Sequence, residues 1–375
     1  MKDNRNLLLI LLVLTLLLSL LTIFVVAEGG VPTVSARSSV LYEPASNTFI
    51  YEKNSTERLS MASTTKIMTA LLAIERCDLN QTVRIPKEAT GIEGSSLYLK
   101  EGDEITVRDL VYSVLLQSAN DAATAIAIYT SGDVKSFADL MNQRAKEIGL
   151  TDTSFENPHG LDSDNHYTTA RDLAILASVA LKNHTFRDIC ATYKHSFFIS
   201  DTQRTVVNHN KLLRLYNGAN GVKTGYTDKS GRCLVSSATK DGLTLIAVTL
   251  NAPNDWNDHK QLLNLGFDGY EAISLSSLFP MEFTVGVTGG RESFVKVSVN
   301  AECSIVTRKK SCNSLTAKIE LDSSLTAPIK KGDTVGSVLL YEGEKLIQSY
   351  EIVADATVKE QKQSISLLDF IKEHF

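Results

Sequence analysis

The chain has 375 residues, a formal net charge of -5 and a sequence pI near 5.9. This length allows about two or three domains with a sizeable core. The slightly acidic balance excludes a general attraction to nucleic acid or to anionic lipid. With 43% hydrophobic and 22% charged residues, the composition is that of a globular protein and excludes a low-complexity or disordered chain.

The N-terminus differs from the rest of the chain. A short polar and basic start is followed by a charge-free, mostly apolar run from Leu7 to Val26, and Val25-Val26-Ala27 offers small residues of the kind a signal peptidase reads. The run is also long enough to span a bilayer. We predict a signal peptide over residues 1–27, with a retained membrane anchor as the alternative, and export of the rest of the chain in either case.

Five cysteines are few for an exported chain, and their number is odd. Cys77, Cys190 and Cys233 are predicted to be small core residues. Cys303 and Cys312 could face each other across a hairpin, and their pairing stays open. No Cys or His pair has metal-ligand spacing, so we expect neither a metal nor another cofactor.

The first part of the chain alternates short strands with helices. Turn chemistry in Pro44-Ala45-Ser46-Asn47 separates two expected strands, and apolar residues at helical spacing follow Thr64. A long polar loop over 157–169 precedes a capped helix, and loops of this length in a compact domain are usually functional or mobile. The expected strands are 38–43 and 48–53. One expected helix begins at 64 and another near 169, and three more span 107–116, 121–129 and 137–148.

The second part is dominated by strands. Segments 221–227, 232–239 and 243–250 form an antiparallel meander with tight turns, and short alternating strands follow from Met281. The tail 361–375 has one apolar helical face that could pack on these strands or lie on a membrane surface. We therefore predict an α+β domain over 32–270, a small all-β domain over 278–360 and the tail.

Ser63-Thr64-Thr65-Lys66 stands at the start of the first helix. Residues three apart share a helix face, so Ser63 Oγ and Lys66 Nζ can come within hydrogen-bond reach. A neutral amine can take the proton of a hydroxyl nucleophile, and a helix N-terminus supplies N–H groups for an oxyanion. The pattern is common by chance, and Ser237-x-x-Lys240 and Ser293-x-x-Lys296 repeat it within expected strands.

Two further patterns accompany it in chain order. Ser118-Ala119-Asn120 falls between two apolar helices, where it is either a helix cap or a rigid polar turn at a site. Lys223-Thr224-Gly225 lies on a strand of the meander, where Lys223 is either a solvated edge charge or a carboxylate ligand. Only these three patterns fall in order on a helix start, a helix junction and a sheet edge.

Together the three patterns resemble the penicillin-recognising serine acyl-transferases, with their Ser-x-x-Lys and Lys-Thr-Gly signatures. Within that superfamily the chain is similar to the low-molecular-mass penicillin-binding proteins that act as serine D-alanyl-D-alanine carboxypeptidases. The resemblance covers about 34–267 and includes Asn157-Pro158-His159-Gly160. It implies a β-lactamase/transpeptidase-like catalytic domain, an antiparallel sheet with a helical cluster, followed by the β-rich domain.

The resemblance also implies a reaction. The enzyme would remove the terminal D-alanine from peptidoglycan stem pentapeptides through an acyl-enzyme and would be acylated by β-lactams, with a role in peptidoglycan maturation and cell shape. Its place would be the extracytoplasmic face of the bacterial membrane or the cell wall. The implied catalytic residues are Ser63 as nucleophile, Lys66 as base, and Ser118 and Asn120 for proton relay and the substrate amide. The implied substrate-binding residues are Lys223 and Thr224 for the carboxylate, Gly225 beside them, Tyr226, whose backbone N–H forms the oxyanion hole with that of Ser63, and His159 near the deacylating water.

Two alternatives stay open, and the chain departs from the family pattern in one place. Some members place an Arg soon after the last core strand, whereas residues 254–260 contain none. A class A-like β-lactamase needs a loop Glu on its deacylating water, and Glu156 does not stand in that pattern. A non-catalytic, membrane-tethered wall-binding protein would use the β-domain as its interaction surface.

Overall fold

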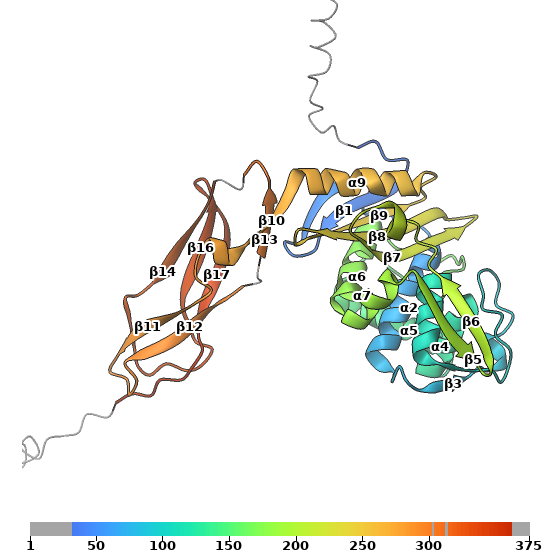
Figure 1. Cartoon of the computed structure of the whole chain (residues 1–375), viewed down its shortest axis with the longest axis horizontal. Helices are drawn as coiled ribbons and strands as arrows, with labels where there is room; N and C mark the ends of the chain where they lie inside the picture. Colours follow the sequence, from blue (N-terminus) through green and yellow to red (C-terminus); the bar gives the residue numbers. More distant parts are fainter. Residues whose placement is uncertain (1–31, 302–303, 312–313, 362–375) are drawn as a thin grey trace, which may run out of the picture.

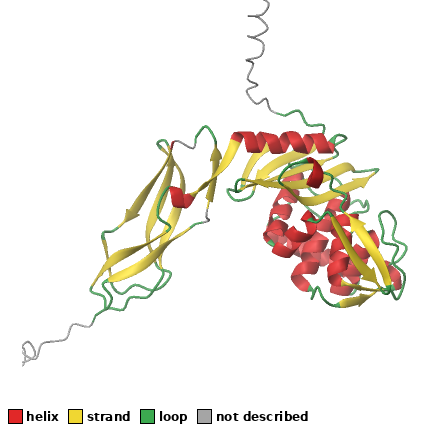
Figure 2. Ribbon diagram, viewed as in Figure 1, coloured by secondary structure: helices red, strands yellow, loops and turns green. Residues whose placement is uncertain are grey.

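The computed structural model describes residues 32–301, 304–311 and 314–361. The predicted signal peptide, nearly all of the tail, Cys303 and Cys312 lie outside these residues. In the part that is described, none of the helices has the length and apolar character needed to cross a bilayer. Figures 1 and 2 show two lobes, one of helices and strands and one of strands.

The first lobe is built on a five-stranded antiparallel sheet in the order β2-β1-β9-β8-β7. Both N-terminal strands have the predicted bounds, and the meander has the predicted order. The edge position of β7 leaves one side of that strand free to face other parts of the lobe. The strands are β1 (Ser38–Glu43), β2 (Thr48–Lys53), β7 (Ala219–Thr227), β8 (Gly231–Lys240) and β9 (Leu243–Leu250).

Alternating side chains bury both faces of this sheet. Val40 and Ile246 point into the core shared with the helical cluster, whereas Leu41 and Leu245 point into the core shared with α9. This is the period-two pattern expected of a strand covered on both sides. The helices are α2 (Lys66–Arg76), α3 (Val107–Tyr112), α4 (Asn120–Ser131), α5 (Val134–Ile148), α6 (Ala170–Lys182), α7 (His184–Ala191), α8 (Leu212–Leu215) and α9 (Asp255–Gly269).

Two small antiparallel hairpins flank the helices: β3 (Thr82–Arg84) pairs with β4 (Glu104–Thr106), and β5 (Lys194–Ile199) pairs with β6 (Thr202–Val207). The sequence analysis did not predict the β5–β6 hairpin or α7 and α8. It predicted one helix over 107–116, where α3 instead ends at Tyr112 and a wider turn follows over Ser113–Gln117.

The second lobe is all-β, as expected. Its six-stranded sheet has the order β14-β16-β17-β12-β11-β15 and encloses a core of aliphatic side chains that includes Val297, Val338 and Ile352. Strands β10 and β13 form a separate ribbon between the lobes (Figure 1). The strands are β10 (Tyr270–Ser274), β11 (Glu282–Thr288), β12 (Phe294–Asn300), β13 (Ser304–Arg308), β14 (Leu315–Leu321), β15 (Ser324–Thr326), β16 (Thr334–Glu342) and β17 (Lys345–Ala354).

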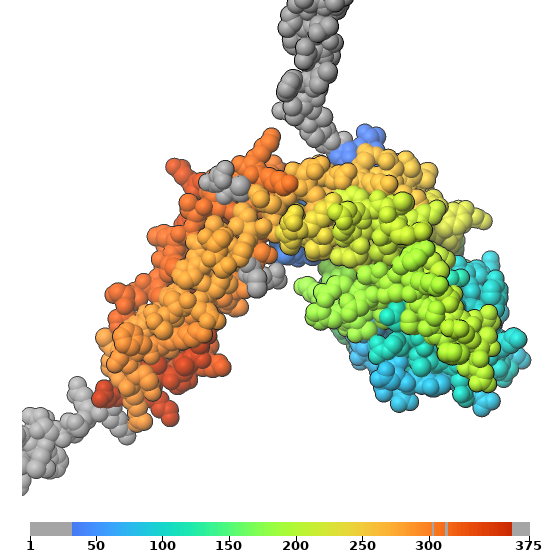
Figure 3. Space-filling view, viewed as in Figure 1, coloured from blue at the N-terminus to red at the C-terminus, as the bar shows by residue number. Residues whose placement is uncertain are grey.

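The first lobe passes into the ribbon between the lobes without a loop. Helix α9 ends at Gly269 and β10 begins at Tyr270. Tyr270, Ala272 and Val306 of the β10–β13 ribbon pack against the core beneath α9. Figure 3 shows the lobes meeting at this end and diverging away from it.

Candidate active site

Ser63 lies in a tight 3-10 turn, Ala62–Thr65, that leads directly into α2. The sequence predicted the helix from Thr64 onward, whereas the α-helix begins at Lys66. Buried apolar side chains such as Ile67 and Leu71 anchor α2 in the core. Ala62, directly before Ser63, has a φ of 46°, a left-handed value that is uncommon outside glycine. The turn thus holds Ser63 in a strained, well-defined position.

Lys66 is fully buried and touches Ser63. Its Nζ lies 2.8 Å from Ser63 Oγ, 2.7 Å from Asn120 Oδ1 and 2.5 Å from the backbone oxygen of His159. Burial, and next the charge of Lys223, lower the pKa of Lys66 well below its usual value, and Asp121 opposes this shift. The site therefore favours the neutral amine.

The chemistry of these three partners orients the amine. The oxygens of Asn120 Oδ1 and of the His159 backbone can only accept hydrogen bonds, so a neutral Lys66 donates its two N–H bonds to them. Its lone pair then faces the hydroxyl of Ser63. This is the arrangement that a general base needs in order to take the proton of a nucleophile.

The predicted Ser118-Ala119-Asn120 turn is joined to both lysines. Ser118 adopts the left-handed conformation, with φ of 63°, and its Oγ accepts a hydrogen bond of 3.0 Å from Lys223 Nζ. Asn120 begins α4, and its Nδ2 donates to the backbone oxygen of Glu93 at 2.5 Å. The turn is therefore more than a helix cap.

Strand β7 brings Lys223 and Gly225 to the turn that carries Ser63. Lys223 is only 1% exposed, so its interpretation as a solvated edge charge is wrong; burial lowers the pKa of Lys223 to about 7. A Cβ on Gly225 would lie 3.0 Å from Ser63 N and 3.1 Å from Thr64 N. Glycine thus permits the strand to pass close beside the nucleophile. Thr224 and Tyr226 flank it, and the Tyr226 ring is exposed.

The loop over 157–169 closes the other side of the site. Thr69 Oγ1 of α2 donates to Pro158 O at 2.6 Å, and a Cβ on Gly160 would lie 1.9 Å from Ala62 O. His159 therefore presents its backbone oxygen to Lys66. Burial, followed by the charges of Lys66 and His166, lowers the pKa of His159 to about 3, so its imidazole is neutral at pH 7.

Sequence reasoning missed the roles of His166 and Asp121. His166 Nδ1 accepts from Glu156 N at 2.9 Å, so Nε2 carries the proton and donates to Thr65 Oγ1 at 2.7 Å. Asp121 accepts hydrogen bonds from Ser96, Leu97 and Leu99, in the loop between β3 and β4. The signal for Asp121 was its position directly after Asn120, which the sequence analysis assigned only to the helix.

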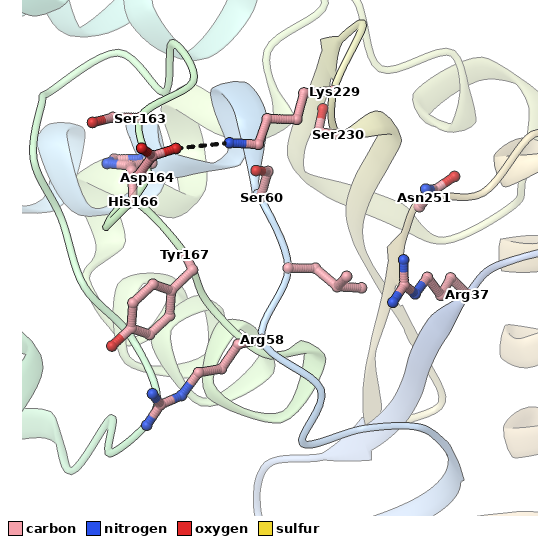
Figure 4. A pocket seen from close by; sticks show the side chains of 11 residues that line it. Arg37, Arg58, Ser60, Ser163, Asp164, His166, Tyr167, Lys229, Ser230 and Asn251 are labelled. Atoms are coloured by element: carbon pink, nitrogen blue, oxygen red, sulfur yellow. Dashed lines mark hydrogen bonds and ion pairs between the residues drawn. The ribbon is translucent and has the colours of Figure 1, made fainter.

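A separate pocket of about 450 Å³ lies beside the same loop (Figure 4). Lys229 reaches across it toward Asp164, at 3.5 Å. Arg58 pairs with Asp152 at 2.7 Å, and Arg37 pairs with Glu57. The residues predicted for catalysis lie outside its lining, which comprises Arg37, Arg58, Leu59, Ser60, Ser163, Asp164, His166, Tyr167, Lys229, Ser230 and Asn251.

Comparison with known proteins decides the family. Residues 26–254 match the family model of the D-alanyl-D-alanine carboxypeptidases. The chain belongs to this family. Residues 281–360 match a second model, the C-terminal domain of penicillin-binding protein 5.

Named relatives agree with this assignment over nearly the full length. D-alanyl-D-alanine carboxypeptidase DacF of Bacillus subtilis is 35% identical, over 90% of this chain and 88% of its own. DacC of Escherichia coli is 35% identical, over 92% and 89%. Penicillin-binding protein 5 from Haemophilus influenzae has a similar structure, with a TM-score of 0.75, 30% identity and coverage of 88% and 99%. The predicted family, fold class and enzyme class are confirmed.

Proposed function

We propose that this protein is a serine D-alanyl-D-alanine carboxypeptidase that removes the terminal D-alanine of peptidoglycan stem peptides through an acyl-enzyme on Ser63. One observation carries the assignment of the nucleophile: the buried Lys66 amine lies 2.8 Å from Ser63 Oγ, with its other two contacts on carbonyl oxygens. The family match supports the reaction class.

Acylation begins when Lys66 takes the proton of Ser63 and Oγ attacks the carbonyl between the two D-alanines. The backbone N–H groups of Ser63 and Tyr226 receive the oxyanion. Ser118 relays the proton to the leaving amine, a role supported by the hydrogen bond of 3.0 Å that its hydroxyl accepts from Lys223. Departure of the last D-alanine leaves an ester on Ser63.

Deacylation uses the same groups. Lys66 is neutral again after the relay and activates a water that hydrolyses the ester. We assign His159 to the orientation of this water; the assignment is supported by the place of His159 beside Lys66, whose amine donates to the backbone oxygen of His159. A β-lactam acylates the same Ser63 and is released slowly.

Recognition of the substrate carboxylate rests on Lys223 and Thr224. The segment after β9, where some family members carry an Arg, has none here and builds the start of α9 instead. Asp255 of that segment accepts from Arg232 Nε at 3.0 Å. Asn120 holds the substrate amide, and its own Oδ1 is aligned by Lys66.

We also propose the surroundings in which the enzyme works. The apolar run before residue 28 acts as a signal peptide that exports the chain to the outer face of the bacterial membrane or the wall. The catalytic domain spans 32–270 and the β-domain 278–360. The tail 361–375 contacts the membrane surface, in keeping with its apolar face.

The test combines two measurements on wild type and Ser63→Ala. The protein is incubated with a fluorescent penicillin and analysed by intact mass, and D-alanine release is measured from diacetyl-Lys-D-Ala-D-Ala. Long-lived labelling that Ser63→Ala abolishes, together with D-alanine release, is the expected result. Rapid penicillin turnover without D-alanine release would indicate a β-lactamase. Neither labelling nor release, from folded protein, would indicate a non-catalytic wall-binding protein.

A further inference from the structure

Tyr98 has an unusual combination of exposure and backbone conformation. Its side chain is 81% exposed, the highest value among the large hydrophobic side chains in the described part of the chain, and its φ is 59°. A bulky residue in the left-handed region is a genuine outlier, because its Cβ crowds the backbone.

The other residues with a positive φ show where this backbone conformation occurs in the chain. Most are Asn or Asp, which tolerate a positive φ, and Ser200 lies in the β5–β6 turn. Ala62 and Ser118 are the remaining cases, and both belong to the active site. Strained backbone concentrates at functional sites, where the surrounding structure holds it in place. The described non-glycine residues with positive φ are Asn47, Asn54, Ala62, Tyr98, Ser118, Ser200, Asp241 and Asn251.

The loop that carries Tyr98 is bound directly to Asn120 and Asp121. Asn120 N donates to Ser95 O at 2.7 Å, and Asp121 accepts from Ser96 Oγ at 2.6 Å. Ser96 Oγ in turn accepts from the backbone N–H of Tyr98 at 2.9 Å. Tyr98 is thus two hydrogen bonds away from the residue that follows Asn120.

The neighbours of Tyr98 fix the direction of its ring. Leu97 and Leu99 are buried in the core, and the backbone N–H of each donates to the carboxylate of Asp121. Tyr98 between them projects away from that core. A turn at this point accounts for the left-handed backbone of Tyr98 but not for its aromatic side chain, because glycine or asparagine would adopt the same backbone conformation with less strain. A tyrosine at this position therefore serves something outside the folded chain.

We propose that Tyr98 is a specificity-determining residue: its ring forms an aromatic wall at the mouth of the site, against which the stem peptide and sugar of peptidoglycan pack. This inference rests on the proposed function. Asn120 holds the substrate amide in that proposal, so a ring on the adjoining loop flanks the chain that leaves this amide. A rigid aromatic ring supplies a large contact area at little entropic cost.

The experiment compares Tyr98→Asn and Tyr98→Phe with wild type on two substrates. Diacetyl-Lys-D-Ala-D-Ala ends close to the scissile bond, whereas purified pentapeptide-rich peptidoglycan extends beyond the mouth. We expect Tyr98→Asn to lower kcat/KM on peptidoglycan by roughly three- to tenfold, the range for loss of an aromatic contact, with little change on the small substrate. Tyr98→Phe should retain wild-type kinetics on both.

Two controls separate this role from a structural one. Tyr129→Ala removes another exposed aromatic from α4, about 13 Å along the helix from Asn120, and should leave both activities unchanged. Tyr98→Asn relieves backbone strain, so its melting midpoint should rise by about 2–4 °C, which excludes unfolding as the cause of lost activity.

The outcomes distinguish this inference from the proposed function. If wild type releases D-alanine from the small substrate and Tyr98→Asn matches wild type on peptidoglycan, the inference of an aromatic wall is overturned and the proposed function stands. An equal loss on both substrates would also overturn it, because the small substrate does not reach the ring. If wild type releases no D-alanine from either substrate, the proposed function and this inference fail together.

Discussion

Gly160 offers a direct test of how the loop over 157–169 positions Ser63, the proposed nucleophile. A Cβ added to Gly160 would lie 1.9 Å from Ala62 O, 2.4 Å from Ala62 C and 2.8 Å from Thr65 Oγ1. Two of these contacts are to backbone, which cannot rotate away. Gly160→Ala must therefore push the loop from the turn that carries Ser63.

The magnitude follows from two contributions. Gly160 has a φ of 88°, which costs alanine about 1–2 kcal/mol in any surroundings. Overpacking at the Ala62 backbone adds about 1–3 kcal/mol. Gly149, at the C-terminal end of α5, also has a φ of 88° but has no atom within 4 Å of its Cβ position. Gly149→Ala therefore isolates the first contribution.

Both stability and acylation are measured for this pair of variants. Urea unfolding should show a loss of about 2–5 kcal/mol for Gly160→Ala and about 1–2 kcal/mol for Gly149→Ala. The rate of acylation by a fluorescent penicillin should fall by about a hundredfold only in Gly160→Ala, because a displacement near 1 Å misaligns Ser63 and removes the His159 oxygen from Lys66. Equal losses in the two variants would refute the proposed contact between loop and nucleophile.

Three further predictions concern the titrating groups. Asn120→Asp places a carboxylate within hydrogen-bond distance of Lys66 and keeps its amine protonated, so penicillin acylation at pH 7 should slow about tenfold or more. The acidic limb of the pH–rate profile, where Lys66 loses its proton and the rate rises, should move to higher pH, and an unmoved limb would contradict this. Lys223 loses its proton above a pKa of about 7, so its attraction for a substrate carboxylate should weaken above pH 7. We expect kcat/KM for a substrate with a free carboxylate to fall above pH 7 relative to kcat/KM for the same substrate as its C-terminal amide. A constant ratio of the two values would exclude Lys223 as the carboxylate ligand. His166 and His259 are buried and neutral, with pKa values of about 4 and about 3. Both pKa values lie below the value near 6.5 for an unfolded chain, so the unfolded chain binds protons first as the pH falls. The contribution of each histidine to the free energy of unfolding is complete above pH 6.5 and should fall by about 1 kcal/mol per pH unit as the pH drops toward 4. Urea midpoints at pH 7.5 and pH 5 measure this fall, and identical midpoints would count against it.

Local patterns in the sequence predicted much of this fold. The strands 38–43 and 48–53 match β1 and β2 because turn residues bound each alternating segment on both sides. The β5–β6 hairpin was missed because its strands expose most of their side chains and show no clean apolar alternation. Where a strand is held by contacts outside its own segment, periodicity carries little information.

The candidate site also contains features that local sequence predicts and features that depend on long-range packing. The spacing of Ser63 and Lys66 places them together through local backbone geometry, and the distance of 2.8 Å between Oγ and Nζ agrees with that expectation. The burial of Lys223 depends on how β7 packs, so its sequence was equally compatible with a solvated charge. The link from His166 to Thr65 joins residues 101 positions apart, and no local pattern reveals such a contact.

The continuous passage from α9 into β10 has a mechanical consequence. With no loop at Gly269–Tyr270 and with the β10–β13 ribbon packed on the core beneath α9, the two lobes cannot swivel freely about a single bond. The β10–β13 ribbon is therefore a rigid extension of the first lobe rather than a flexible tether. An anchor at the far end of the β-domain would therefore also restrict the directions in which the mouth of the proposed site can face.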